Sequence, residues 1–370
     1  MKRWLIILVA LLVCGCSANV ATRARPAVAA KPDTSHFLIG AAAASAAQFQ
    51  QATGVQPDIL EHYARIGTDF SVNFAGNSVP LIQLMPYGES LASIAGGSDD
   101  SWLISYARAV AAYQRPVVLG FAPEANGDWY PWGDGHVSAA DYIAAWRHVV
   151  TVFRDQGAGN VTWIWTVNVD ITASADNPSN AVASPTPWWP GDRWVDWIGL
   201  DGYFYRSAET FNIVFGTTLA QVRALTRKPV MISETAVAPA AGKAGKIPGL
   251  FAGASESGMI GLTWFDLRGN RDWPLEDDPA ALAAFRAEVA AYTKPTLPPT
   301  PTPTGTQSSP PASPTATPSP PASPTTPSSP PTQSSPPSSP TTAPSAPASS
   351  SPPAAPVATP SRPASSSPPA

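Results

Sequence analysis

The sequence predicts an α/β fold: a (β/α)8 TIM barrel in a single domain, followed by a disordered Pro/Ser/Thr-rich C-terminal tail. Eight short apolar runs follow one another through the middle of the chain, and segments with helical periodicity separate several of them. Roughly 260 residues lie between the N-terminal segment and the tail, a length that one barrel fills. No Gly-rich turn of the G-x-G-x-x-G kind opens a helix, which disfavours the competing doubly wound sheet.

Each predicted strand is a run of mostly apolar residues bounded by Gly, Pro or polar residues. The strands are expected at residues 37–40, 59–63, 80–85, 116–121, 161–167, 195–200, 229–232 and 258–264. Helical spacing is found at residues 102–113, 139–154, 218–226 and 278–292, and Asp277 or Asp278 is the expected N-cap of the last helix. Periodicity is weakest between residues 41 and 76, so the first two βα units are the least well defined.

Residues 1–16 have the pattern of a signal peptide with a lipobox. Lys2 and Arg3 precede an apolar run that is short for a membrane span, and the small residue Gly15 precedes Cys16. We expect lipidation at Cys16 and a location on the extracellular face of the bacterial cell membrane; ordinary secretion is the alternative. A spacer at 17–33 and a folded domain at 34–293 would follow. Both cysteines lie in the first segment, so the domain has no disulfide and no thiolate metal site.

Residues 294–370 hold more than half of the 44 prolines and almost no large apolar residues. Such a composition cannot bury enough surface to offset chain entropy, so a disordered spacer is expected. The net charge of -4 and the absence of a Lys/Arg run argue against nucleic acid as a partner. The four histidines show no metal-ligand spacing, so neither a metal nor another cofactor is expected. We expect a monomer.

Two glutamates stand directly after predicted strands. Glu124 follows the fourth strand and Glu234 follows the seventh. Reacting groups of this fold lie at the C-terminal ends of strands, and a carboxylate there is costly unless it is paired or used. Two carboxyls about 5–5.5 Å apart can cleave a glycosidic bond with retention. We therefore interpret the two residues as a catalytic pair; pairing with a nearby Arg or capping of a loop is the alternative for each.

Aromatic residues gather around the same strand ends. Trp129, Tyr130 and Trp132 follow Glu124, the sixth strand ends in Asp201-Gly202-Tyr203, and the eighth ends in Trp264-Phe265-Asp266. Aromatic faces at several strand ends would form the walls of a sugar-binding cleft, although core packing is the alternative for any one tryptophan.

Three segments resemble the family 26 glycoside hydrolases, the β-mannanase family. Residues 123–133 (PEANGDWYPWG) resemble the acid/base segment of that family. Residues 189–203 (WPGDRWVDWIGLDGY) are similar to a second signature, and residues 228–234 (KPVMISE) look like the nucleophile strand. The resemblance covers about residues 36–292, with the three segments in the right order.

The resemblance implies a (β/α)8 barrel that hydrolyses β-linked polysaccharides with retention and without a cofactor. It gives Glu124 the acid/base role and Glu234 the nucleophile role. Tyr203 matches the tyrosine that hydrogen-bonds the nucleophile, and Asp201 matches an acidic residue of the same pocket. The substrate-binding candidates are Trp129, Asp201, Tyr203, Trp264, Asn126 and Trp132.

One position departs from the family pattern. The family usually has His-Glu-Met-Asn-Gly at the acid/base, whereas this chain has Pro123-Glu124-Ala125-Asn126-Gly127. Proline cannot supply the polar contact that a histidine makes there, which bears on substrate identity more than on chemistry. Endo-β-1,4-mannan leads narrowly over mixed-linkage β-glucan and xylan. A non-catalytic carbohydrate-binding barrel on the cell envelope is the alternative of another class.

Overall fold

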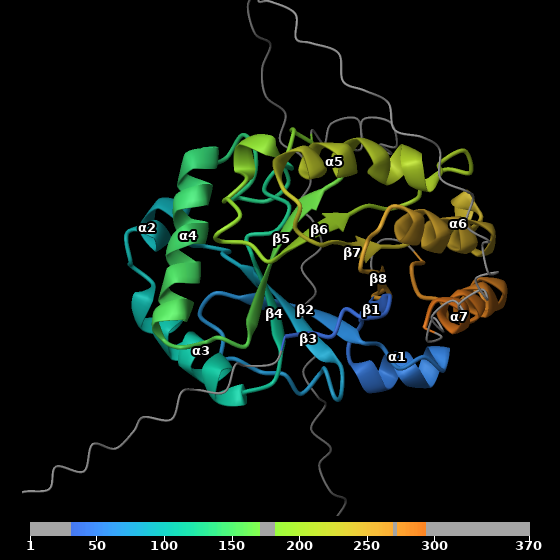
Figure 1. Cartoon of the computed structure of the whole chain (residues 1–370), viewed down its shortest axis with the longest axis horizontal. Helices are drawn as coiled ribbons and strands as arrows, with labels where there is room; N and C mark the ends of the chain where they lie inside the picture. Colours follow the sequence, from blue (N-terminus) through green and yellow to red (C-terminus); the bar gives the residue numbers. More distant parts are fainter. Residues whose placement is uncertain (1–30, 171–181, 269–271, 294–370) are drawn as a thin grey trace, which may run out of the picture. The chain divides into compact units, whose positions relative to one another are not determined.

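The structure is a computed structural model that describes residues 31–170, 182–268 and 272–293 (Figure 1). The predicted signal peptide with Cys16, nearly all of the 17–33 spacer and the 294–370 tail lie outside the described residues. Within the described ranges, no helix is long and apolar enough to cross a membrane.

Eight parallel strands of the described chain close into a barrel in sequence order, with β1 paired to both β2 and β8. This confirms the predicted fold class. The strands are β1 (Leu38–Ala42), β2 (Ile59–Arg65), β3 (Val79–Met85), β4 (Val117–Phe121), β5 (Val161–Asn168), β6 (Trp197–Asp201), β7 (Val230–Thr235) and β8 (Gly261–Phe265).

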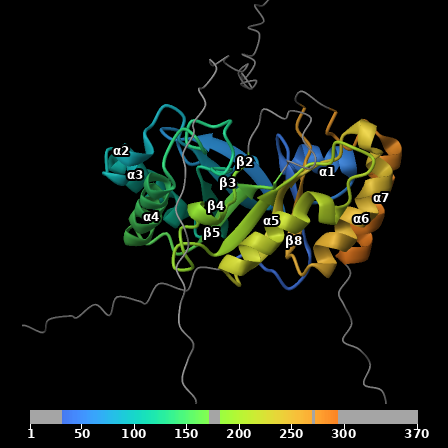
Figure 2. The same ribbon diagram turned by 90° about the horizontal axis from the view of Figure 1, so that it is seen from above.

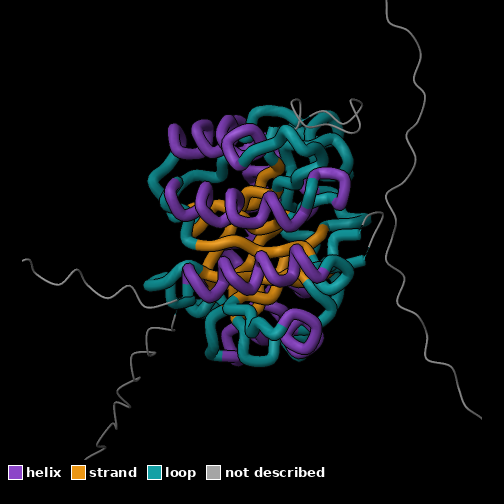
Figure 3. Tube along the Cα trace, turned by 90° about the vertical axis from the view of Figure 1, so that its right-hand side faces the viewer, coloured by secondary structure: helices purple, strands orange, loops and turns teal. Residues whose placement is uncertain are grey.

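Helices surround the strands, as Figures 1 and 2 show from two directions. They are α1 (Ala46–Thr53), α2 (Leu91–Ala95), α3 (Asp100–Tyr113), α4 (Ala139–Asp155), α5 (Phe211–Leu225), α6 (Lys243–Glu256) and α7 (Pro279–Tyr292), with 3-10 turns at η2 (Thr186–Trp188) and η3 (Pro239–Ala241). Figure 3 shows the strands at the centre with helices in front of and around them.

The sequence patterns predicted α3, α4, α7 and the second half of α5, but not α1, α2 or α6. Helix α6 contains Pro248 and three glycines, residues with poor helix propensity. It forms nonetheless because Ile247, Leu250, Phe251 and Ala254 are buried on one face. Tertiary packing therefore outweighs local propensity in this segment.

The interior of the barrel has an apolar layer near the N-terminal ends of the strands. Its members come one from each of seven strands: Leu38, Ile59, Leu81, Val118, Ile164, Trp197 and Met231. Because side chains alternate along a strand, the residue two positions further on also points inward. Those residues are Gly40, Glu61, Gln83, Gly120, Thr166, Gly199 and Ser233. The second layer of the interior is thus polar and lies one step below the mouth.

A β-bulge near the end of β7 changes the direction of its last side chains. Leu200 pairs with Ile232 but Asp201 pairs with Glu234, so β7 has one extra residue at Ser233. The Ser233 hydroxyl lies inside the barrel, where it would clash with a Cβ at Gly199. A bulge lets consecutive residues face the same side. Ser233 and Glu234 therefore both point into the barrel.

Candidate active site

Glu124 lies on a strained turn directly after β4. Ala122 and Glu124 have φ angles of 46° and 55°, in the left-handed region that non-glycine residues rarely adopt, and Pro123 stands between them. The turn is held because Glu124 N donates to Thr166 O at 3.0 Å and Trp132 Nε1 donates to Pro123 O at 2.8 Å. Such strain is found where surrounding structure fixes a side chain for function.

Two side chains donate hydrogen bonds to the Glu124 carboxyl. Trp129 Nε1 donates to Oε2 at 2.9 Å, and Asn168 Nδ2 donates to Oε1. Burial, followed by the nearby charge of Glu234, raises the pKa of Glu124 to about 7, although the two donors oppose the rise. Glu124 can therefore hold a proton near neutral pH and lose it again.

Glu234 is held by two phenols, one on each carboxyl oxygen. Tyr63 OH donates to Oε1 at 2.5 Å, and Tyr203 OH donates to Oε2 at 2.5 Å. Burial raises the pKa of Glu234, while both tyrosine hydrogen bonds oppose the rise by favouring the ionised form. The Tyr203 contact is the one that the family resemblance implies.

Tyr63 was not among the predicted site residues; it lies on β2, far from both glutamates in the chain. A signal was present: Glu61 and Tyr63 alternate along a predicted strand and so share its inward face. Closure of the barrel brings this face opposite β7, which local periodicity does not reveal.

Asn126 supports the site by holding Asn168 rather than by facing a substrate. Its Oδ1 accepts from Asn168 N at 2.9 Å, and its Nδ2 donates to Asn168 O at 2.8 Å and to Ala183 O at 3.2 Å. The side chain is fully buried and these bonds occupy both NH groups of its amide. Its proposed contact with substrate is therefore corrected: Asn126 positions Asn168, a donor to Glu124.

Trp264 and Trp132 also require correction as substrate-binding residues, because both rings are buried. Trp264 points out of the barrel, where its ring packs edge-on against Phe285 of α7, and its Nε1 donates to Trp273 O at 3.3 Å. Adjacent strand residues face opposite sides, so a ring on this side of β8 cannot reach the mouth. Trp132 stacks on Tyr130 with ring centroids 4.5 Å apart and supports the turn at Pro123.

The remaining two candidates differ in their access to the mouth. Trp129 is half-buried beside Glu124, so it keeps some exposure to solvent, unlike Trp132 and Trp264. Asp201 is buried, and its Oδ1 accepts from Ser233 Oγ at 2.6 Å. Burial and the charges of Glu234, Glu124 and Glu61 raise the pKa of Asp201 well above its ordinary value. Asp201 is thus a buried carboxyl on β6 that pairs in register with Glu234 on β7.

Aromatic rings form the two sides of the site. On the side of Glu234, Trp273 lies 5.2 Å from the Tyr203 ring and 6.0 Å from the Tyr205 ring. On the side of Glu124, Tyr87 packs edge-on against Trp132 at 4.8 Å. Trp132 and Trp273 are buried, whereas Tyr87, Tyr203 and Tyr205 are at least partly exposed. The exposed parts of these three rings are the kind of surface that stacks on the C–H faces of sugars.

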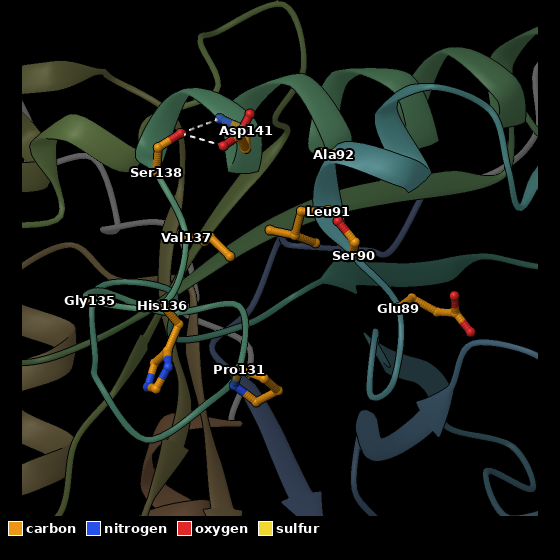
Figure 4. A pocket seen from close by; sticks show the side chains of 10 residues that line it. All are labelled: Glu89, Ser90, Leu91, Ala92, Pro131, Gly135, His136, Val137, Ser138 and Asp141. Carbon is orange, nitrogen blue, oxygen red and sulfur yellow. Dashed lines mark hydrogen bonds between the residues drawn. The ribbon is translucent and has the colours of Figure 1, made fainter.

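A separate cavity of about 590 Å³ lies between the loops that follow β3 and β4 (Figure 4). Neither Glu124 nor Glu234 lines it. Two of its polar side chains are occupied by the start of α4, since Ser138 Oγ donates to Asp141 Oδ2 at 2.6 Å and accepts from Asp141 N. This cavity is therefore distinct from the paired carboxyls.

The site is rich in carboxyls and poor in cations. Among the ion pairs of the described residues, none involves Glu61, Glu124, Asp201 or Glu234. No group of His, Cys, Asp and Glu suited to a metal is found in the described ranges. The mouth of the barrel thus holds two carboxyls, Glu124 and Glu234, that accept hydrogen bonds from different donors and lie between aromatic residues. This is the architecture of the glycoside hydrolases that use two carboxyls.

Comparison with known proteins points to one family. The model of glycosyl hydrolase family 26 matches residues 101–265 of the chain. Over 264 residues the chain is 34% identical to Endoglucanase H of Acetivibrio thermocellus. This match covers 66% of this chain and 28% of that protein. Over 144 residues the chain is 30% identical to Beta-1,3-xylanase TXYA of a Vibrio species, which covers 39% of this chain and 28% of that protein. The chain thus matches little more than a quarter of either relative.

A solved structure agrees with the fold. The catalytic domain of the Bacillus sp. JAMB-750 GH26 endo-beta-1,4-mannanase superimposes with a TM-score of 0.55 at 16% identity, over 70% of this chain and 87% of that one. This likeness concerns the barrel alone.

Proposed function

We propose that this barrel is a retaining glycosidase that cleaves a β-linked polysaccharide with Glu124 and Glu234. The observation that carries the proposal is the unequal environment of the two carboxyls. Glu124 has a pKa raised to about 7, whereas each oxygen of Glu234 accepts a phenol hydrogen bond. An acid and a nucleophile need this division, because one must keep its proton while the other is ionised.

The reaction follows from these positions. A Glu234 oxygen attacks the anomeric carbon while the Glu124 carboxyl gives its proton to the glycosidic oxygen, so the leaving sugar departs neutral. A covalent glycosyl ester to Glu234 results. Glu124, now ionised, takes a proton from water as that water attacks the anomeric carbon and releases Glu234. Both residues return to their starting state.

The names of the similar proteins indicate which substrate to test first. Similarity to Endoglucanase H extends over 264 residues at 34% identity, which favours β-glucan as the first substrate to test. Mannan, which the family resemblance alone favours, is the second candidate, and xylan is the third. Pro123 leaves the position before the acid without a polar side chain, in keeping with a substrate other than the commonest of the family.

The test is a substrate screen with the active-site variants as controls. Purified protein is incubated with mixed-linkage β-glucan, β-mannan, β-1,4-xylan and β-1,3-xylan, and new reducing ends are measured. Glu124→Ala and Glu234→Gln should remain folded and lose activity by several orders of magnitude. NMR of the first product should show the β anomer, since retention preserves the configuration.

Two outcomes would overturn the proposal. Near wild-type turnover by either variant would remove that residue from the chemistry. Binding to a glycan without any release of reducing ends would instead favour the alternative of a non-catalytic carbohydrate-binding barrel.

We also propose that lipidation of Cys16 attaches the protein to the outer face of the cell membrane. Full-length protein should then sediment with membranes, and Cys16→Ala should release it. Equal release of both proteins would favour ordinary secretion.

A further inference from the structure

A third carboxyl, Glu61, lies in the polar layer beneath the proposed nucleophile. It projects from the inward face of β2, one alternation before Tyr63. Only 1% of Glu61 is exposed, and Gln83 Nε2 donates to its Oε1 at 3.1 Å. Gln83 Nε2 also donates to Thr166 Oγ1 at 3.0 Å.

Two acceptor atoms of this pair have no donor. Glu61 Oε2 and Gln83 Oε1 are both buried without a hydrogen-bond partner. An ionised Glu61 would leave both oxygens unsatisfied and would bury a charge without a cationic partner, which is costly. One proton on Glu61 converts an unsatisfied acceptor into a donor and removes the charge.

The surrounding groups favour the same state. The titratable groups that act on Glu61 are Tyr63 on its own strand, Glu124 after β4 and Glu234 on β7, and Asp201 on β6 is in turn affected by Glu61. None of these supplies a positive charge. Burial and then the charge of Glu234 raise the pKa of Glu61 well above its ordinary value, against the weaker effects of Gln83 and Tyr63.

We propose that Glu61 carries a proton at the pH where the protein works and acts as a neutral positioning residue under Glu234. Ionised, it would place a like charge in the barrel interior next to the nucleophile. Neutral, it leaves Glu234 as the buried carboxyl that ionises while the two phenols stabilise it. The part of this inference that concerns the nucleophile rests on the proposed function, whereas the proton on Glu61 does not.

The first experiment needs no substrate. A proton that binds more tightly to the folded than to the unfolded chain makes stability fall as pH rises above the ordinary Glu pKa of 4.5. Glu61→Gln mimics the neutral acid and removes this loss. Chemical unfolding is therefore measured for both proteins from pH 4.5 to pH 8.

The unfolding constant of the wild type, relative to that of Glu61→Gln, should rise with pH by up to about tenfold per pH unit. The exposed Glu256→Gln serves as the control for loss of a carboxyl. If the unfolding constant of the wild type, divided by that of Glu61→Gln, stays constant over this pH range, the proposal is overturned.

An infrared difference spectrum gives a second readout. The carboxylic-acid C=O band of the wild type at neutral pH should lose one component in Glu61→Gln, because glutamine has no such group. If the carboxylate bands lose intensity instead, Glu61 is ionised and the proposal fails. Both measurements can be made even if no glycan is cleaved, so they are decided separately from the proposed function.

The kinetic consequence tests the positioning role. Glutamine has the same shape as the protonated Glu61 side chain and carries no charge. Glu61→Gln should therefore retain kcat within a few fold and leave the acid limb of the pH profile in place. Glu61→Leu removes the hydrogen bond to Gln83 and should lower kcat with a change in that limb. Loss of activity by orders of magnitude in Glu61→Gln, with its fold intact, would mean that the charged form is required.

Discussion

Asn126 and Asn168 are joined by a pair of amide–backbone hydrogen bonds, in which the Asn126 side chain accepts from Asn168 N and donates to Asn168 O. The Asn168 side chain in turn donates to Glu124 Oε1. The residue two positions after the proposed acid thus fixes the residue that contacts it. This closed loop of contacts ties the turn after β4 to the end of β5.

The first prediction concerns Asn168→Ala. Asn168 donates to the ionised form of Glu124, so its removal should raise the pKa of Glu124 above about 7. The acid then keeps its proton to higher pH, and the alkaline limb of the kcat/KM profile should move upward by about one unit. The profile on the best substrate of the screen is the measurement.

Asn160→Ala is a matched control for this variant. Asn160 is also buried and donates two backbone hydrogen bonds, to Val110 O and Arg115 O, but it has no contact with Glu124. It should lose stability and keep its alkaline limb. An unmoved limb in Asn168→Ala would contradict the assigned contact.

The second prediction concerns the two phenols on Glu234. Tyr63→Phe and Tyr203→Phe each remove a donor that favours the ionised carboxyl, so each should raise the pKa of Glu234. The acid limb of the pH profile should move upward, and turnover on its slope should fall about tenfold for each unit of the shift. Tyr106→Phe, a buried tyrosine of α3, should leave the limb unchanged.

Equal effects of the two active-site variants would show that both phenols act on the nucleophile. An effect of Tyr203→Phe alone would mean that Tyr63 serves the packing of β2 and no more.

The barrel could be predicted from the sequence because its strands are continuous apolar runs, and the places of Glu124 and Glu234 at strand ends follow from the same runs. The contact of Tyr203 with Glu234 was implied by the family resemblance. Tyr63, Gln83 and Asn168 could not be predicted, since their roles depend on strand neighbours brought together by closure. Trp264 was expected on the inward face of its strand but lies on the outward face. A strand buried on both faces shows no alternation of apolar and polar residues, so the sequence does not indicate which residues point inward. Register, which periodicity does not determine, therefore decides which side chains reach the mouth.

The third prediction tests that correction with two tryptophans. Trp264→Ala should cost about 3–5 kcal/mol of stability by opening a cavity against Phe285, while KM stays unchanged. Trp129→Phe should cost little stability but lower kcat/KM, because Glu124 loses a donor on Oε2. Unfolding and kinetics are measured on both proteins. A raised KM in a folded Trp264 variant would return that ring to the cleft.

The fourth prediction concerns the segment that carries Trp273 to the side of Tyr203. Asp266 Oδ1 accepts from Leu275 N at 2.9 Å, and Lys243 Nζ donates to the carbonyls of residues 272, 273 and 274. Burial is the main cause that raises the pKa of Asp266 to about 7, against the hydrogen bond from Leu275. The folded chain therefore binds this proton more tightly than the unfolded chain does.

Since the pKa of Asp266 is raised, its contribution to stability is fully present below pH 3.8 and is lost as pH rises to about 7. Asp266→Asn keeps the oxygen that accepts from Leu275 and cannot ionise. Relative to this variant, the wild type should lose up to about 1.4 kcal/mol per pH unit within that window and nothing further above it. Denaturant unfolding at pH 4, 5.5, 7 and 8.5 measures the difference. Parallel curves for the two proteins would show that Asp266 is ionised throughout, and the anchoring of Trp273 would then be independent of pH.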